Sequence, residues 1–162
     1  MDEIKLLQAL ENNARIDLTD LCDELNENEN TVTTNIQRLE DDNVICGYHT
    51  IINWDKTNKD KVTALIEIGA IPKRESGYDD IAKKIYLYPE VSTMYLMSGK
   101  TEFTVVISGK TMREVAEFVA RKLAPIEGVN KTETYFVLKQ YKVEGVILDE
   151  EERQFERQIV SL

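Results

Sequence analysis

The side chains that most often carry out covalent or metal chemistry are scarce in this sequence. One histidine, His49, and two cysteines, Cys22 and Cys46, occur in 162 residues. A cysteine and histidine zinc centre needs four ligands at short spacings, which these three residues cannot supply. An enzyme needs a nucleophile, a base and orienting groups that converge, and no such set is evident. We therefore predict no catalytic residues, no metal site, no cofactor and no enzymatic activity.

Each chemistry-bearing residue has a simpler interpretation. Cys22 falls on the apolar side of a predicted helix and is interpreted as a core residue, and His49 as a wing or packing residue. Cys46 is an alternative candidate for a redox sensor, but nothing near it in the sequence would lower its pKa. Gly99-Lys100-Thr101 superficially matches the end of a phosphate-binding loop, yet the earlier glycine and the following helix of such a loop are missing.

Hydrogen bonding to DNA bases is the chemistry that residues 28–41 offer. Val32, Ile36 and Leu39 follow a helical spacing and predict the buried side of a helix. Asn28 is suited to cap its start. Asn, Gln and Arg side chains pair with adenine or guanine edges, and the opposite side is polar. The candidate DNA-binding residues there are Asn30, Thr33, Thr34, Gln37 and Arg38. The alternative is a polar side that only faces solvent.

Two shorter helices and a strand would position this helix. We expect the first helix over residues 4–12, and a second that begins after Asp17 or Thr19 and ends at Asn26. Val44–Ile52 is expected to form a short strand or wing. The core-facing residues predicted for the first two helices are Ile4, Leu7, Ala9, Leu10, Leu18, Leu21, Cys22 and Leu25. Together these elements form a helix-turn-helix pattern, whose third helix enters a DNA major groove.

The charge of the sequence is unevenly distributed. Residues 1–60 contain five basic and fourteen acidic side chains, a net charge of −9, whereas residues 61–162 contain fifteen and sixteen, a net charge of −1. Duplex DNA attracts proteins largely through Lys and Arg at its phosphates. The acidic N-terminal part therefore predicts few phosphate contacts. We expect weak DNA binding for each dimer of the chain and a shallow dependence of that binding on salt concentration.

The second part alternates strands and helices in the order β-α-β-β-α-β. This order is typical of a ferredoxin-like fold, one four-stranded antiparallel sheet with two helices on one face. The predicted elements are strands Lys61–Ile68, Val91–Met97, Glu102–Ser108 and Val129–Lys142, a helix from about Ser76, and a helix capped by Thr111. The apolar stripe expected on the second helix is Met112, Val115, Ala116, Val119 and Leu123. The whole chain is thus predicted to be α+β.

Both faces of this sheet are predicted to be apolar. One set of residues is Leu65, Met94, Leu96 and Val106, and the other is Tyr95, Met97, Val105 and Phe103. Two helices cover one face only, so the second face requires another partner. We expect that partner to be a second copy of the chain. The alternative is a monomer with an open, half-apolar sheet.

Short motifs along residues 1–142 occur in an order known from one family. They are Arg38-Leu39-Glu40, Ile45-x-Gly47-Tyr48, Val62–Ile68, Tyr95–Gly99, Phe103–Ile107, Gly128-Val129 and Thr132-x-Thr134-Tyr135. In these motifs the chain resembles the Lrp/AsnC (feast/famine) family of prokaryotic transcription regulators. The resemblance implies an N-terminal winged helix-turn-helix, a C-terminal ligand-sensing domain, and dimers that assemble further, commonly to octamers.

The resemblance also implies an effector, often an amino acid, held between dimers at the turn after the second strand. The effector-binding candidates in this turn are Ser98, Gly99, Lys100, Thr101 and Glu102. Many relatives have Gly-Asp-Tyr-Asp here, so only the last carboxylate is kept. The chain also has Glu27-Asn28 where relatives usually have Leu-Ser, and Asn35 where a basic residue is common. These changes reduce the positive potential of the predicted DNA-binding helix.

The expected organisation is a DNA-binding domain over residues 1–53, a linker over 54–60, a sensing and oligomerising domain over 61–142, and an extension over 143–162. In the extension, Val143–Leu148 is predicted as an edge strand, followed by a short acidic-capped helix or a tail. No export signal or membrane-spanning run is visible, so we expect a cytoplasmic protein. Its expected partners are double-stranded DNA, a small effector and further copies of itself. The alternative function is a small-molecule sensing or protein-partner module with weak or lost DNA binding.

Overall fold

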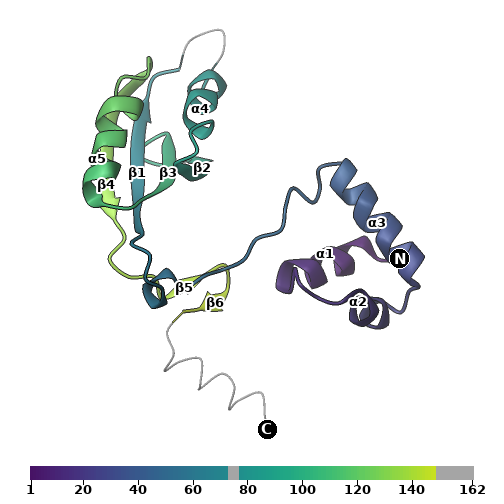
Figure 1. The fold of residues 1–162 in the computed structure, drawn as a ribbon. Coiled ribbons are helices and arrows are strands. Elements are labelled where there is room, and N and C mark those ends of the chain that lie inside the picture. Colours follow the sequence, from purple (N-terminus) through teal and green to yellow (C-terminus); the bar gives the residue numbers. More distant parts are fainter. Residues whose placement is uncertain (73–76, 149–162) are drawn as a thin grey trace. The chain divides into compact units, whose positions relative to one another are not determined.

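The computed structural model describes residues 1–72 and 77–148, which fall into two compact units (Figure 1). The first unit is Met1–Ile51 and contains three helices, and the second begins at Ile52 and contains the sheet. No helix in the described ranges is long and apolar enough to cross a membrane.

The first unit consists of α1 (Glu3–Asn12), α2 (Leu18–Leu25) and α3 (Glu29–Asp41). The predicted caps at Asn26 and Asn28 are confirmed, whereas Asp17 occupies the N-cap position of α2 without a side-chain hydrogen bond to the helix. Asn26 ends α2 in the left-handed conformation, and the Asn28 side chain accepts a hydrogen bond from the Thr31 backbone N–H at 2.9 Å. Local side-chain chemistry therefore sets the boundaries of α3.

The core of this unit lies between the three helices and differs from the prediction on α1 and α2. Its buried residues are Leu6, Ala9, Leu21, Cys22, Val32 and Leu39. Ile4 and Leu18, which were expected inside, are exposed at the first turns of their helices. Leu6 takes the buried position instead of Ile4, because α1 turns a different part of its surface toward α2 and α3.

Of the predicted strand or wing over Val44–Ile52, the strand is wrong, since the structure assigns no strand to these residues. The backbone N–H groups of Val44 and Ile45 both donate to the Leu39 carbonyl, which closes the end of α3. A strand needs a second strand beside it to form a ladder. Among the described residues, none lies beside this segment.

The second unit contains a four-stranded antiparallel sheet in the order β2-β3-β1-β4. The strands are β1 (Val62–Ala70), β2 (Val91–Leu96), β3 (Phe103–Gly109) and β4 (Val129–Phe136). Helices α4 (Asp79–Tyr86) and α5 (Met112–Phe118), the latter extended by the π-helical turn η2 (Val119–Leu123), lie on the same face of the sheet (Figure 1). The predicted ferredoxin-like order is thus confirmed. The expected start of α4 near Ser76 lies outside the described residues.

The helix-covered face holds the larger core. Its fully buried strand residues include Ala64, Ile66, Ile68, Phe103, Val105 and Ile107. The predicted stripe on α5 is partly wrong, because Met112 and Ala116 are exposed while Phe118 is buried. The ring of Phe118 packs edge-on against Tyr88 at 5.5 Å, and Phe118 joins Val115 and Leu123 in the core between helices and sheet.

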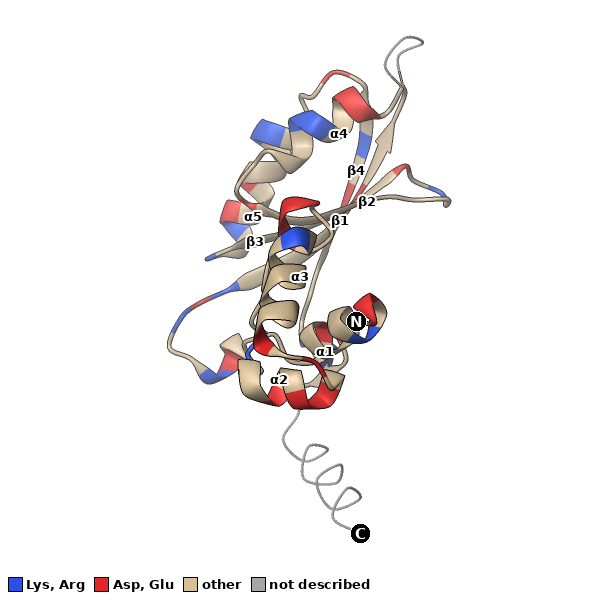
Figure 2. Cartoon of the chain, turned by 90° about the vertical axis from the view of Figure 1, so that its right-hand side faces the viewer, with Lys and Arg blue, Asp and Glu red and all other residues tan. Residues whose placement is uncertain are grey.

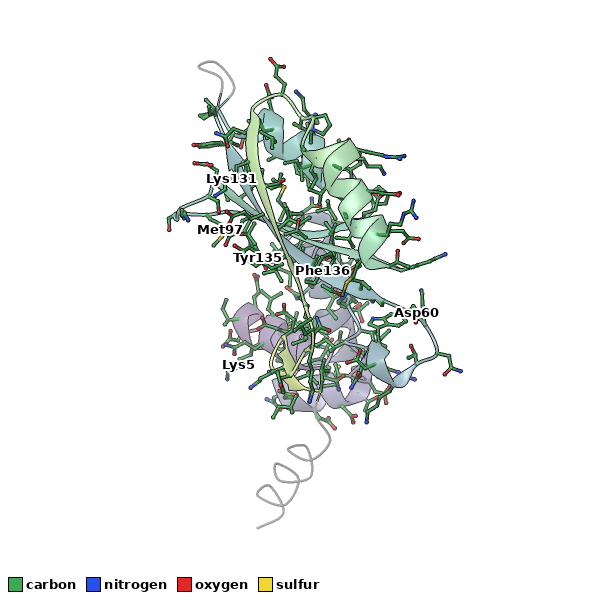
Figure 3. The ribbon with its side chains drawn as sticks, turned by 90° about the vertical axis from the view of Figure 1, so that its left-hand side faces the viewer. Lys5, Asp60, Met97, Lys131, Tyr135 and Phe136 are labelled. Carbon is green, nitrogen blue, oxygen red and sulfur yellow. The ribbon has the colours of Figure 1, made fainter. Side chains whose placement is uncertain are left out.

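The strand register corrects the predicted division of apolar residues between the two faces. Met94 lies opposite Val105 and Leu96 opposite Phe103, so both belong to the helix-covered face. The open face instead carries Leu65, Val106, Tyr95 and Tyr135. Figure 3 shows Met97, Lys131 and Tyr135 on the side of the sheet away from α5, and Phe136 on the helix side.

The last strand and the C-terminal segment also differ from the prediction. Strand β4 ends at Phe136 and not at Lys142. Its end lies beside the start of antiparallel β1, where Val137 N–H donates to Thr63 O at 2.9 Å, and β1 has no residue before Val62 to continue the ladder. The expected edge strand Val143–Leu148 is a separate hairpin of β5 (Lys142–Val143) and β6 (Val146–Ile147). Leu148 O accepts from the side chain of Asn53, directly before the short 3-10 helix η1 (Trp54–Lys56). The predicted acidic helix or tail lies outside the described residues.

Candidate functional site

Helix α3 places the five candidate DNA-binding side chains on its exposed surface. Asn30, Thr33, Thr34, Gln37 and Arg38 are all exposed. Val32 and Leu39, on the other side of the helix, are buried against α1 and α2. The helix therefore has one side committed to the core and one polar side available to a partner.

The candidates differ in how far their polar groups are already engaged. In the described part of the chain, no hydrogen bond or ion pair holds the side chains of Asn30, Thr33 and Thr34, which lie in the N-terminal half of α3. Gln37 donates to Asp41 Oδ1 at 3.1 Å. The N-terminal part of the helix thus has the free donors and acceptors that base recognition requires.

Arg38 is held by acidic side chains from two places in the unit. Its guanidinium donates to Glu3 Oε1 at 2.5 Å and to Asp42 Oδ2 at 3.3 Å. It also reaches Asn35 Oδ1 at 3.5 Å. The cation closest to the polar side of α3 is therefore already paired.

Acidic residues surround this polar side. Figure 2 shows Asp and Glu along α2 and at both ends of α3. Glu29 and Asp41 are the exposed carboxylates at these ends of α3. The chemistry that α3 offers is accordingly neutral amide and hydroxyl hydrogen bonding, with little positive potential for phosphates.

The segment after α3 is anchored by Tyr48. Its hydroxyl donates to Glu40 Oε1 at 2.8 Å, and burial together with this carboxylate raises the pKa of Tyr48. Cys46 is exposed and its thiol donates to the Asn43 carbonyl. Cys22 is buried, and this burial, with the charges of Glu29 and Asp23, raises the pKa of its thiol. Cys22 therefore belongs to the core.

The predicted effector turn does not gather its five side chains around one point. Ser98, Gly99 and Lys100 are exposed, whereas Thr101 is buried. Glu102 turns back toward the end of β1, where its Oε2 accepts from Ala70 N–H at 2.7 Å. In the described ranges no hydrogen bond engages Oε1 of this carboxylate, so one oxygen stays available.

The open sheet face carries a row of charged side chains that the sequence analysis did not predict. Glu67 and Glu133 lie directly opposite each other on β1 and β4. Lys131 pairs with Glu133, and Tyr135 donates its hydroxyl to Glu133 at 2.9 Å. These two partners hold the pKa of Glu133 below its usual range, and the charge of Lys100 adds to the effect. The spacing of Lys131, Glu133 and Tyr135 at every second position was the signal for a shared face.

A cavity of about 280 Å³ lies beside this row. It is lined by Leu65, Glu67, Thr104, Tyr135, Phe136 and Val137. Among the described residues, no group of three or more His, Cys, Asp or Glu side chains is placed to hold a metal ion. The open face thus combines apolar side chains with a partly compensated set of carboxylates.

Comparison with known proteins gives the same division of the chain. Residues 1–45 match the family model for winged helix-turn-helix DNA-binding, and residues 63–147 match that for the Lrp/AsnC ligand binding domain. The uncharacterized HTH-type transcriptional regulator YugG of Bacillus subtilis is 39% identical over 91% of this chain and 89% of its own length. The leucine-responsive regulatory protein of Haemophilus influenzae is 24% identical over 86% and 84%.

Solved structures share this fold. The transcriptional regulator NMB0573 from Neisseria meningitidis, solved in complex with L-Met, has a TM-score of 0.69 and 24% identity, covering 86% of this chain and 90% of its own. AsnC from E. coli has a TM-score of 0.64 and 20% identity over 85% and 91%. With its two domain matches and its B. subtilis relative, the chain belongs to the Lrp/AsnC family of transcription regulators.

Proposed function

We propose that this regulator reads DNA through the exposed side of α3, with Asn30, Thr33, Thr34, Gln37 and Arg38 as the contacting residues. The observation that carries the proposal is the exposed polar side of α3, unengaged at Asn30, Thr33 and Thr34, opposite the side that buries Val32 and Leu39. Amides at Asn30 and Gln37 suit adenine edges, and Arg38 suits guanine or a phosphate. The protein acts in the cytoplasm as a binding protein and not as an enzyme.

The open sheet face is proposed to pair with the same face of a second copy. Tyr95, Met97 and Tyr135 are each about half exposed on this face, at 55%, 47% and 51%. Large exposed apolar side chains gathered on one sheet face are costly in water and mark an interface. Dimers formed in this way can associate further, up to octamers.

The effector is proposed to be an amino acid bound at the turn Ser98, Gly99, Lys100, Thr101 and Glu102. The solved complex of the Neisseria meningitidis regulator contains L-Met, which supports an amino acid as the ligand class. Glu102 has one carboxylate oxygen free to accept from the ammonium group of a ligand, while the other holds Ala70. Lys100 is exposed and is suited to pair with the carboxylate of that ligand.

The test is direct binding of the full chain to a labelled duplex of the DNA upstream of its own gene, with and without each of the twenty amino acids. We expect weak binding per dimer, a shallow salt dependence, and useful affinity only where several half-sites lie about one helical turn apart. Arg38→Ala should weaken binding, and Gln37→Ala should relax base preference, by about 1–3 kcal/mol for each contact. If both variants bind like the parent, α3 is not the contacting helix.

A second candidate function is a sensing or protein-partner module that has lost most DNA affinity. The acidic character of residues 1–60, with a net charge of −9, favours it. The same binding experiment separates the two functions. A chain that binds an amino acid by calorimetry but no duplex at low salt would fit the second.

A further inference from the structure

The Arg38 guanidinium is shared between two helices of the DNA-binding unit. Glu3 is the first residue of α1, 35 positions before Arg38, and its carboxylate meets the exposed part of α3. Asp42 binds the other side of the guanidinium from the C-cap of α3. Arg38 therefore faces carboxylates that belong to the protein itself.

Basic side chains are scarce in the DNA-binding unit, so the pairing of Arg38 strongly affects the positive charge that the unit presents. Residues 1–51 contain twelve acidic side chains and three basic ones, which are Lys5, Arg15 and Arg38. Of the three cations, only Arg38 lies on the proposed contact side of α3. Whether Arg38 is paired or unpaired therefore strongly affects how well this side of α3 attracts DNA, which is a polyanion.

We propose that Glu3 is an internal competitor of DNA, which holds Arg38 in the free protein and has to release it when DNA binds. A guanidinium presents the same fork of N–H donors to a carboxylate and to a phosphate or a guanine edge. Arg38 cannot satisfy both at once with the same nitrogen. The inference rests on the proposed role of Arg38 as a DNA contact, and adds that Glu3 tunes the affinity of this contact.

The exposure of the pair makes this exchange feasible. The side chains of Arg38 and Glu3 are 45% and 50% exposed, so water screens their attraction. An exposed ion pair is weak enough for a DNA acceptor to displace. Its removal should tighten DNA binding by about two- to five-fold, the range that an exposed pair accounts for.

The experiment compares the full-length parent with Glu3→Gln and with Glu11→Gln as a matched control. Glu11 is exposed on the same helix, and no ion pair in the described part of the chain involves it. Both changes remove one negative charge from α1, but only Glu3→Gln removes a carboxylate that binds Arg38. Affinity is measured by fluorescence anisotropy on the duplex upstream of the gene, at one salt concentration, and circular dichroism checks that each variant is folded.

Each variant is also made in an Arg38→Gln background. We expect Glu3→Gln to bind the duplex two- to five-fold tighter than Glu11→Gln, and this difference to vanish when Arg38 is replaced. Asp42→Asn should give a smaller gain, because its contact with Arg38 is longer at 3.3 Å.

Three results for Glu3→Gln would overturn the inference. One is equal affinity of Glu3→Gln and Glu11→Gln, a second is weaker binding of Glu3→Gln than of the parent, and a third is a gain that persists without Arg38. The failure of the proposed function looks different, since then neither the parent nor any variant binds the duplex. Binding by the parent that Arg38→Gln leaves unchanged would remove Arg38 from the contact set and this inference with it.

Discussion

Gly128, at the entry to β4, offers a sharp test of how tightly the sensing unit is packed. Its φ is +96°, a region that residues with a Cβ rarely adopt. A Cβ added there would lie 2.6 Å from Ile81 Cδ1 and 3.2 Å from Ile71 O. Gly128 O also accepts from Ile71 N–H at 2.8 Å, which holds the end of β1 to the start of β4. Gly128→Ala therefore combines backbone strain with a steric clash.

The two costs can be separated with Gly77. Its φ is +60° and an added Cβ would meet no atom of the described residues within 4 Å, so Gly77→Ala carries the backbone cost without the clash at Ile81. That cost is about 1–2 kcal/mol for a residue in the left-handed region. Overpacking against Ile81 and the Ile71 carbonyl adds about 1–3 kcal/mol. We expect Gly128→Ala to lower the free energy of unfolding by about 2–5 kcal/mol and Gly77→Ala by about 1–2 kcal/mol.

The assay is urea unfolding of the full chain at fixed protein concentration, followed by the fluorescence of the single tryptophan, Trp54, which lies in the same unit. Fixed concentration matters because association with a second copy would add to the apparent stability. Equal unfolding free energies for the two variants would refute the packing argument, since the clash at Ile81 would then cost nothing.

Three further predictions concern the open face, the effector turn and a partly buried ion pair. Leu65→Glu adds a third carboxylate to the open face, beside Glu67 on β1 and Glu133 on β4. The added charge should convert a dimer to a monomer in light scattering, and an unchanged mass would place the interface elsewhere. Glu102→Gln should abolish effector-dependent changes in DNA binding while leaving the unliganded dimer folded, and an unchanged calorimetric affinity for the effector would contradict its role. Lys122 hydrogen-bonds Glu90 and lowers the pKa of that carboxyl. The pair therefore stabilises the fold above the ordinary carboxyl pKa and loses this effect as pH falls through the lowered value, so the difference in Tm between the parent and Lys122→Met should shrink from pH 7 toward pH 3. A constant difference would mean that only packing is lost.

Local signals in the sequence were sufficient for much of the fold. Asn28 and Thr111 cap helices with their own side chains, and Asn26 ends a helix because it tolerates the left-handed conformation. Alternation along β1 separates Ala64, Ile66 and Ile68 from Leu65 and Glu67, since neighbouring side chains of a strand point to opposite sides, but it does not say which set the helices cover. The exposed side of α3 followed from helical spacing in the same way.

Features that depend on distant residues were decided by the tertiary structure. The end of β4 depends on where its antiparallel neighbour β1 begins, and Phe118 on α5 packs against Tyr88 from a distant part of the chain. The hydrogen-bond partners of the functional side chains were likewise decided by the tertiary structure. Helical spacing predicted that Arg38 is exposed, but only the packing of α1 against α3 brings the Glu3 carboxylate to the Arg38 guanidinium. The turn sequence contains Glu102, but only the sheet register brings its carboxylate to the backbone of Ala70. Short-range spacing determines which way a side chain points, whereas its partners are set by chain segments that no local pattern places.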